Sequence, residues 1–436
     1  MIRRFLIKIF QGKKRLIREL IKNKILTFDK KISEKNRYLA EGAKFLEEFQ
    51  NEISHYISNN KRYTRLNIIN QNCNLSCSYC VVDKVRKDGC KSLKRSSEEK
   101  QKKVCNVIDQ FITRNSPSKE QRYINFNGGE FLLEFKVLEG AINYLKRVYP
   151  NENIKLALNS NGTLINEYIA HFLIDNAVDV AISIDGYSQS NDLTRRYRDG
   201  RGTFEDIIRG VQLLNKYRNE PNTSYQGTLI PNEEFNIEQI QEMADHGFTS
   251  ARLGVDLLSI DSKQARKMAR LHFKMVHETH AKAVKIVDNF YSHFDNVILQ
   301  KEKVLHFGFF CEAFASRGLT TYNYNIDLEA GNLLCAFTPN RVSMDEIDFD
   351  IYHPMLFNES LKYLKNRFDA IKEHCLDCDL ISICCGGCIM TGIDAFNTKN
   401  EIACIFMDEV WHQFLELLST APSDEASASV EIYKQV

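Results

Sequence analysis

The feature that most constrains the fold of this chain is a regular alternation of strand-like and helical segments between residues 64 and 256. Short segments rich in β-branched and apolar residues indicate strands at 64–70, 122–127, 154–159, 178–185, 224–230 and 250–256. Amphipathic stretches between them indicate helices at 97–114, 134–147, 166–176, 203–218 and 236–246. Because helices separate successive strands, we expect an α/β fold with a parallel sheet and right-handed crossovers.

The loops after the predicted strands carry the polar and sulfur-containing residues. In parallel sheets of this kind, ligands bind beyond the carboxyl ends of the strands. The loop after the first strand, "NQNCNLSCSYC", holds Cys73, Cys77 and Cys80 within eight positions and has no nearby histidine. A structural zinc ion needs four ligands. Three thiolates leave one metal position open, which suits a metal cluster that binds a substrate.

The thirteen cysteines of the chain also point to metal chemistry. The sequence contains no run of 18 uncharged apolar residues, and Lys8 interrupts the apolar patch at its start. We therefore expect neither a transmembrane helix nor a signal peptide, and we predict a cytoplasmic protein. Thiols stay reduced in that compartment, so the cysteines are expected to bind metal or clusters rather than to form disulfides.

The cysteine loop resembles that of the radical S-adenosylmethionine (SAM) superfamily, and the resemblance covers about residues 62 to 412. It implies a partial (β/α)6 TIM-like barrel. In that family, three cysteines hold three irons of a 4Fe–4S cluster and SAM chelates the fourth. One electron then cleaves SAM to methionine and a 5′-deoxyadenosyl radical. The resemblance implies that Cys73, Cys77 and Cys80 are the ligands and that Tyr79 packs near the adenine.

The loop after the second strand, "FNGGEF", looks like the family's Gly-Gly-Glu motif. Glycines let a backbone approach a ligand closely, and a glutamate can pair with an ammonium group. The resemblance implies that Gly128, Gly129 and Glu130 bind the SAM amino group. Phe131 departs from the pattern, because many relatives have proline there.

The loops after the third and fourth strands, "NSNG" and "SIDG", offer short polar side chains that suit a ribose and a methionine carboxylate. These residues are Asn159, Ser160, Asn161, Ser183 and Asp185. The resemblance places Ser183 and Asp185 near the ribose. It also implies that Arg195 pairs with the SAM carboxylate.

A second group of cysteines, in "CLDCDLISICCGGC", is similar to the SPASM extension of radical SAM enzymes that modify peptides. That extension carries two auxiliary 4Fe–4S clusters, so three 4Fe–4S clusters are expected in all; a pair of zinc sites is the alternative. The resemblance implies an outer cluster on Cys375, Cys378, Cys384 and Cys404, and it leaves Cys311, Cys335 and Cys388 for an inner one. Two full clusters need eight thiolates. We therefore expect an open or non-cysteine position on the inner cluster, with Cys385 as the alternative ligand.

The remaining organisation follows from composition and pattern. We expect a basic helical extension over 1–61, a radical SAM core over 62–260, a linking helix over 261–304, a SPASM domain rich in loops over 305–412, and a helix end with a disordered tail over 413–436. The histidines of the linking helix, His272, His277 and His280, are expected at the surface or between helices rather than on a metal.

The first 35 residues carry a net charge of +9, whereas the whole chain carries +1. The simplest interpretation is a solvated helix that packs on the body through one apolar stripe. A docking surface for an acidic peptide, or a peripheral contact with anionic lipid, is the alternative. The segment has no basic motif rich in aromatic residues, so we expect no nucleic-acid binding.

SPASM proteins act mostly on peptides or protein side chains. We therefore predict an oxidoreductase that matures a ribosomally made precursor peptide by oxidative crosslinking through C–C, C–O or thioether bonds. The alternative is a sulfatase maturase that makes formylglycine, although Ala336 stands where such enzymes commonly place an aspartate. A non-enzymatic iron–sulfur electron-transfer protein is a third reading. The expected partners are a flavodoxin or ferredoxin as reductant and, if the basic helix does not recognise the leader, a separate leader-binding protein.

Overall fold

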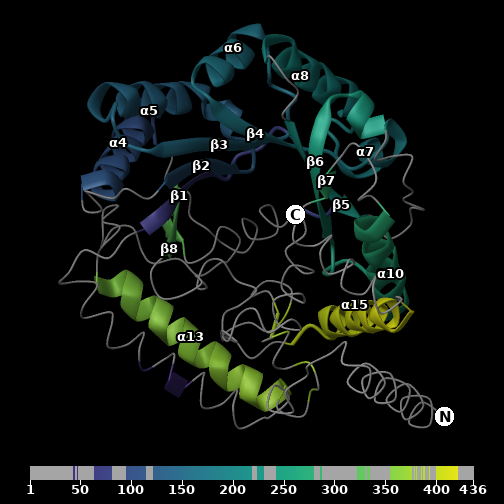
Figure 1. Cartoon of the computed structure of the whole chain (residues 1–436). Helices are drawn as coiled ribbons and strands as arrows, with labels where there is room; N and C mark the ends of the chain where they lie inside the picture. The colour runs from purple at the N-terminus through teal and green to yellow at the C-terminus, as the bar shows by residue number, and fades with distance from the viewer. Residues whose placement is uncertain are drawn as a thin grey trace.

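The predicted parallel sheet is present and lies at the centre of the computed structural model (Figure 1). The structure describes residues 63–80, 95–113, 121–218, 223–229, 242–278, 285–286, 322–328, 331–333, 354–375 and 399–420, with 43, 44, 47, 378, 380, 384, 386, 387 and 392. Within these residues the sheet has nine strands in the order β7-β6-β5-β4-β3-β2-β1-β8-β9.

Six strands of the sheet correspond to the predicted ones. They are β1 (Tyr63–Asn70), β2 (Arg122–Gly128), β3 (Ile154–Ser160), β4 (Val178–Ser183), β5 (Thr223–Leu229) and β6 (Phe248–Val255). Each pairs in parallel with the next. The expected α/β class and partial (β/α)6 barrel are therefore confirmed.

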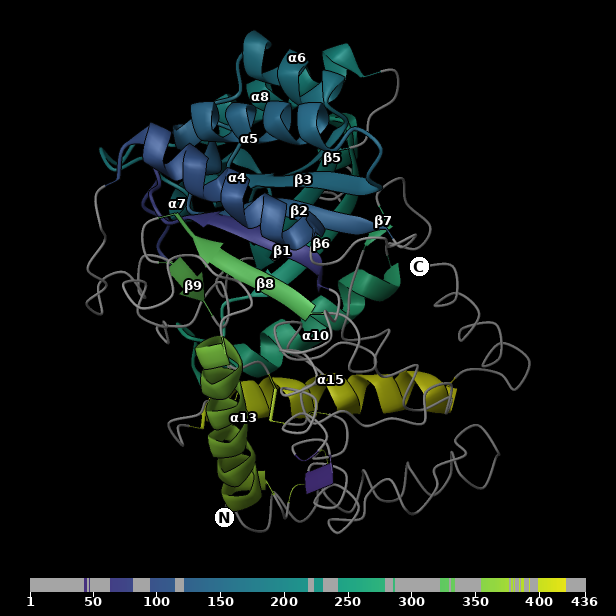
Figure 2. The same ribbon diagram turned by 90° about the vertical axis from the view of Figure 1, so that its left-hand side faces the viewer.

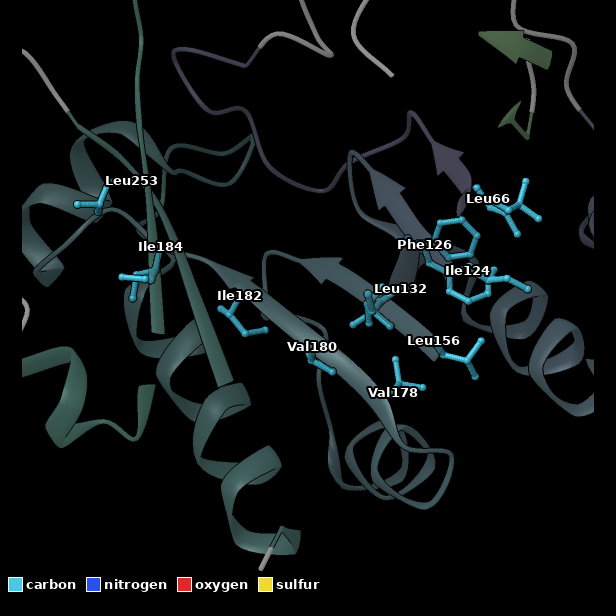
Figure 3. Close-up of a cluster of buried hydrophobic side chains, with 14 of the residues drawn as sticks. Leu66, Ile124, Phe126, Leu132, Leu156, Val178, Val180, Ile182, Ile184 and Leu253 are labelled. Carbon is cyan, nitrogen blue, oxygen red and sulfur yellow. The ribbon is translucent and has the colours of Figure 1, made fainter. Parts of the chain in front are cut away.

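Helices cover one face of this sheet (Figures 1 and 2). They are α4 (Ser97–Thr113), α5 (Phe135–Val148), α6 (Glu167–Asp175) and α8 (Phe204–Tyr217). Alternate strand residues such as Leu66, Ile124 and Leu156 point toward them and are buried (Figure 3). Each such side chain contributes about 1.5–3 kcal/mol when fully buried, so this face holds the core. The predicted helix at 236–246 lies largely outside the described residues.

The opposite face of the sheet is polar. Asn67 of β1 donates through Nδ2 to Asn325 Oδ1 at 2.8 Å, and it accepts from Asn125 Nδ2 of β2, also at 2.8 Å. Asn127 adds a longer contact to Asn67 at 3.4 Å. In a closed barrel this interior is packed with branched apolar residues. Here it presents a row of amide side chains.

Three strands were not predicted. β7 (Lys285–Ile286) pairs in parallel with β6, and β8 (Tyr322–Asp327) pairs in parallel with β1. β9 (Gly331–Leu333) then returns antiparallel to β8. The sheet of the core therefore continues into the segment that we expected to form a loop-rich SPASM domain.

The linking-helix prediction was wrong at residues 285–286. Helix α10 covers Ser262–Glu278, and residues 285–286 form β7 rather than more helix. The expectation of loops after residue 305 was also wrong in part, because the structure has two long helices there, α13 (Pro354–Cys375) and α15 (Glu401–Thr420). Proline at the first position of α13 suits a helix start.

No helix among the described residues is long and apolar enough to cross a bilayer.

Helices α10 and α15 are joined by a buried carboxylate. Glu409 of α15 pairs with Arg270 of α10 at 2.8 Å and with Arg266 at 3.4 Å. His272, on the same helix as the arginines, is buried and contacts the ring of Phe406 edge-on. This agrees with the expected interhelical place of His272, whereas the side chains of His277 and His280 lie outside the described residues.

Candidate active site

Two glycines lock the cysteine loop against the end of β2. Gly128 has φ +117°, and a Cβ atom there would lie 2.2 Å from the Asn70 carbonyl oxygen. A Cβ on Gly129 would lie 2.5 Å from the Asn72 carbonyl oxygen. Instead, Gly129 N–H donates to the Asn70 carbonyl at 2.6 Å, and Glu130 N–H donates to that of Asn72 at 2.8 Å. Only glycine fits where the two backbones approach this closely.

The carboxylate of Glu130 links β2 to β3. It is fully buried and accepts from Leu132 N–H at 3.0 Å, from Asn161 N–H at 2.7 Å, and from the Ser160 hydroxyl at 3.0 Å on both oxygens. Burial raises the pKa of Glu130, and the backbone and hydroxyl donors oppose that shift. In this structure the carboxylate therefore fixes the loop after β3.

That loop in turn holds the cysteine loop. The side-chain amide of Asn161 donates to Asn74 Oδ1 at 2.9 Å and lies 3.8 Å from Cys73 Sγ. Asn74 donates to the Thr163 hydroxyl at 2.9 Å, and Thr163 donates back to Asn161 Oδ1 through its N–H and hydroxyl. Sequence reasoning missed Asn74 and Thr163, because their roles depend on contacts between loops about 90 residues apart.

The segment after helix α7 (Ser188–Thr194) closes the other side of the cysteine loop. Ser76 N–H donates to the Arg196 carbonyl at 2.8 Å, and Ser78 N–H donates to the Thr194 carbonyl at 3.0 Å. The Arg198 guanidinium donates to the Cys73 carbonyl at 3.0 Å. The three-cysteine loop is thus held by backbone hydrogen bonds on both flanks.

Cys73, Cys77 and Cys80 lie within electrostatic reach of one another. Burial raises the pKa of the Cys73 thiol to about 11, and the Leu75 N–H, 3.4 Å from its sulfur, opposes this rise. Burial likewise raises the pKa of Cys77, while the nearby Arg195 charge opposes it. Buried thiols of this kind become thiolates when they bind metal and release their protons. The sulfurs of the three cysteines, one of them with an N–H donor, fit a cluster with three protein ligands.

Tyr79, Asp185 and Arg195 form one buried network. The Tyr79 hydroxyl donates to Asp185 Oδ2 at 2.5 Å, and Arg195 Nη1 donates to the Tyr79 oxygen at 2.7 Å. Asp185 also accepts from the Thr194 hydroxyl at 2.9 Å and lies 3.8 Å from Arg195. No local sequence pattern indicated the role of Thr194.

The Nε atom of Arg195 is a buried hydrogen-bond donor. Only 8 % of the residue is exposed, and its Nε has no hydrogen-bond acceptor among the residues that the structure describes. Buried polar groups are normally paired. An anionic ligand such as the carboxylate of SAM would satisfy this donor, so the site fits the cofactor that the resemblance implies.

The other predicted SAM-site residues flank this network. Asn159 is exposed at the end of β3, and Ser183 is half-buried at the end of β4. The part of the chain that the structure describes contains no three His, Cys, Asp or Glu side chains placed to hold a single metal ion. The thiolates of a 4Fe–4S cluster bind separate irons and are spaced differently.

Four of the C-terminal cysteines lie in the described residues. Cys375 ends α13, and the N–H of Cys378 donates to its carbonyl at 2.9 Å. Burial raises the pKa of Cys375 to about 12, and the charges of Cys378 and Cys404 add to the rise. Cys384 follows on a turn, where its N–H donates to the Leu380 carbonyl at 2.7 Å. The positions of Cys311, Cys335, Cys385 and Cys388 lie outside the described residues.

The segment that carries these loops matches a known protein family. Residues 67–244 match the radical SAM superfamily. Over 203 residues the chain is 30% identical to an uncharacterised protein of Methanocaldococcus jannaschii, covering 47% of this chain and 63% of that one. It is 32% identical over 154 residues to a cysteine-type anaerobic sulfatase-maturating enzyme of Clostridium novyi, covering 35% of this chain and 40% of that enzyme. The chain thus spans less than two thirds of the length of these curated relatives.

A radical SAM cyclopropyl synthase, TigE of Paramaledivibacter caminithermalis, is 24% identical over 191 residues, or 39% of each chain. Among solved structures, native anSMEcpe with bound AdoMet and Cp18Cys peptide superposes with a TM-score of 0.61. That likeness has 20% identity and covers 81% of this chain and 99% of the other, so it supports the fold. With the three-cysteine loop in place at the end of β1, these matches identify residues 67–244 as a domain of the radical SAM superfamily.

Proposed function

We propose that this chain modifies a peptide or protein side chain by SAM-initiated radical chemistry, and that it oxidatively crosslinks residues of a ribosomally made precursor peptide. The names of its relatives support a polypeptide substrate. The sulfatase-maturating enzymes act on a sulfatase, and the superposed anSMEcpe structure contains a bound peptide.

The chain's own residues supply the binding functions for this chemistry. Cys73, Cys77 and Cys80 would hold a 4Fe–4S cluster, and the free Nε of Arg195 would pair with the SAM carboxylate. When bound, the cluster and SAM supply a 5′-deoxyadenosyl radical. The Gly128–Gly129 contact with Asn70 and Asn72 keeps the cysteine loop in place while the site is loaded.

The observation that carries the choice of a peptide is the amide row on the inner face of the sheet. Asn67, Asn125 and Asn325 join three strands through two hydrogen bonds of 2.8 Å. Amide side chains offer donors and acceptors that match a peptide main chain, whereas a phosphate or carboxylate group would call for arginine or lysine. Crosslinking removes two hydrogen atoms from the peptide. The radical derived from SAM would take one of them, and the other would leave as a proton and an electron, for which an auxiliary cluster would be the acceptor.

The C-terminal cysteines extend the proposal. Cys375, Cys378, Cys384 and Cys404 would hold an outer auxiliary 4Fe–4S cluster, and Cys311, Cys335 and Cys388 would hold an inner one with an open or non-cysteine position. Such clusters transfer single electrons. A flavodoxin or ferredoxin is the proposed source of the electron that starts turnover.

Formylglycine formation on a sulfatase is a second candidate, because several relatives are sulfatase-maturating enzymes of the cysteine and serine types. The residue that argued against it, Ala336, lies outside the described residues. The two candidates differ in product. A crosslinked peptide loses two hydrogens and gains no carbonyl, whereas formylglycine is an aldehyde that reacts with hydrazide probes.

The first test is anaerobic incubation of the reconstituted protein with SAM and dithionite. We expect 5′-deoxyadenosine to form, and we expect Cys77→Ala to abolish it. A fully reconstituted protein that makes none would refute the radical mechanism.

The second test is coexpression with a short peptide encoded beside this gene. A mass loss of two hydrogens without hydrazide reactivity supports crosslinking, because formylglycine made from serine also lacks two hydrogens. A hydrazide-reactive product on a sulfatase peptide favours the second candidate.

A further inference from the structure

A buried arginine on α13 lies on the same helix face as one of the C-terminal cysteines. Arg367, Ile371 and Cys375 are spaced four residues apart, so they occupy one stripe of the helix. Arg367 is only 1% exposed, and Ile371 is fully buried. The stripe therefore faces the interior and ends at a proposed cluster ligand.

The double-glycine turn after Cys384 packs on this stripe. Gly386 and Gly387 have φ values of +79° and +71°. Arg367 Nη2 donates to the Gly387 carbonyl at 2.5 Å. A Cβ on Gly386 would lie 2.7 Å from Ile371 Cδ1. The Gly387 N–H donates in turn to the Cys384 carbonyl at 2.8 Å. Gly387 therefore connects the Arg367 guanidinium to the backbone of Cys384 through two hydrogen bonds.

Positive charge gathers at this group of thiols. Arg367 contacts the turn that follows Cys384, and Lys399 lies five positions before Cys404 in the chain. Lys399 pairs with Glu401 at 3.0 Å and is partly exposed, so solvent and the carboxylate weaken its effect. Arg367 is buried, so solvent screens its charge less than that of the partly exposed Lys399.

We propose that Arg367 is a positioning residue for the site formed by Cys375, Cys378, Cys384 and Cys404, and that its charge raises the reduction potential of the cluster held there. The inference rests on the proposed function, in which these cysteines bind an auxiliary 4Fe–4S cluster. Reduction adds one electron and no proton, so it makes the cluster more negative. A buried cation beside it favours the reduced form.

The test is a potentiometric titration, followed by electron paramagnetic resonance, of the full-length reconstituted protein. The background carries Cys73→Ala, Cys77→Ala and Cys80→Ala, so that only auxiliary clusters remain. The signal lost on Cys375→Ala identifies the outer cluster. In this background Arg367→Gln is compared with Arg367→Lys, which keeps the charge. Lys372→Gln is the control, because Lys372 lies on the same helix, is partly exposed and pairs with Asp369 at 2.5 Å.

We expect Arg367→Gln to lower the midpoint potential of the outer cluster by at least the equivalent of a tenfold change in its reduction constant, about 59 mV for one electron. Arg367→Lys should recover most of the shift, and Lys372→Gln should leave the potential unchanged. An unshifted potential in Arg367→Gln, or an equal shift in Arg367→Lys, would overturn the electrostatic role. If the background protein binds no iron, the auxiliary-cluster assignment itself fails, which is a different result from an unshifted potential.

Discussion

Replacing Gly128 with alanine tests how strictly the end of β2 sets the cysteine loop. The added Cβ would lie 2.2 Å from the Asn70 carbonyl oxygen and 2.9 Å from the Asn70 carbonyl carbon and nitrogen. These are backbone atoms of β1, which cannot rotate aside as a side chain could. At φ +117°, alanine is also in a region that essentially only glycine occupies.

The expected cost has two parts. Holding alanine at this φ costs about 1–3 kcal/mol. Relieving the overlap moves Asn70 away from Gly129, which breaks the hydrogen bond of 2.6 Å between the Gly129 N–H and the Asn70 carbonyl. It also strains the bond that the Asn70 side chain donates to the Glu130 carbonyl at 2.9 Å. Each buried hydrogen bond contributes about 0.5–1.5 kcal/mol. We therefore expect Gly128→Ala to destabilise the protein by about 2–6 kcal/mol.

The assay is urea unfolding of the cluster-free protein, with iron content measured after reconstitution. Gly200→Ala is the matched control, because Gly200 also has a positive φ, +88°, but a Cβ there meets nothing within 4 Å. Left-handed backbone alone should cost the control about 1–2 kcal/mol. If the two variants differ by less than about 1 kcal/mol, the close approach to Asn70 does not stabilise the loop as argued.

Three further predictions concern charge and metal. Burial tends to raise the pKa of Glu409, but Arg270, together with His412 and Gln413, outweighs burial and lowers that pKa below the ordinary 4.5. Glu409→Gln should therefore cost about 1 kcal/mol in unfolding free energy at pH 7, and the difference from wild type should vanish as pH falls from about 4.5 through the lowered pKa. Arg195→Gln should weaken SAM binding about tenfold or more, measured by equilibrium binding to reconstituted protein, because it removes a charge-assisted contact; unchanged affinity would contradict the carboxylate role. Cys77→Ala should lose about four irons per chain, whereas Cys105→Ser should lose none, and equal iron loss in both would refute the ligand assignment.

The order and bounds of the main strands could be predicted because each is a local pattern. The segment 154–159 alternates buried and exposed positions between turn residues, and the structure has β3 at Ile154–Ser160. The placement of the cysteine loop followed from the rule that ligand sites lie at the carboxyl ends of parallel strands. Local sequence and topology were sufficient for these features.

The contacts that complete the site could not be predicted. Tyr79 and Asp185 are 106 positions apart, and nothing near either one indicates their hydrogen bond. Strand β8 is six residues long, and its partner β1 lies far back in the chain. Such features depend on tertiary proximity. The contacts of the Gly-Gly-Glu loop could be predicted only in part. Its glycines predicted a close backbone approach, but only the structure shows that the approach is to the Asn70 and Asn72 carbonyls.

The pairing of β1 with β8 has a consequence for how the chain folds. Asn67 and Asn325, which face each other across these strands, are 258 positions apart. Closing so long a loop is entropically costly, and contacts of high sequence separation form slowly. During synthesis, β1 can pair with β2 long before β8 leaves the ribosome. The edge of β1 that later pairs with β8 remains unpaired during this time. An unpaired strand edge favours aggregation. We therefore expect the isolated segment 62–260 to be soluble only when this edge is protected, because the strand that covers it lies outside that segment.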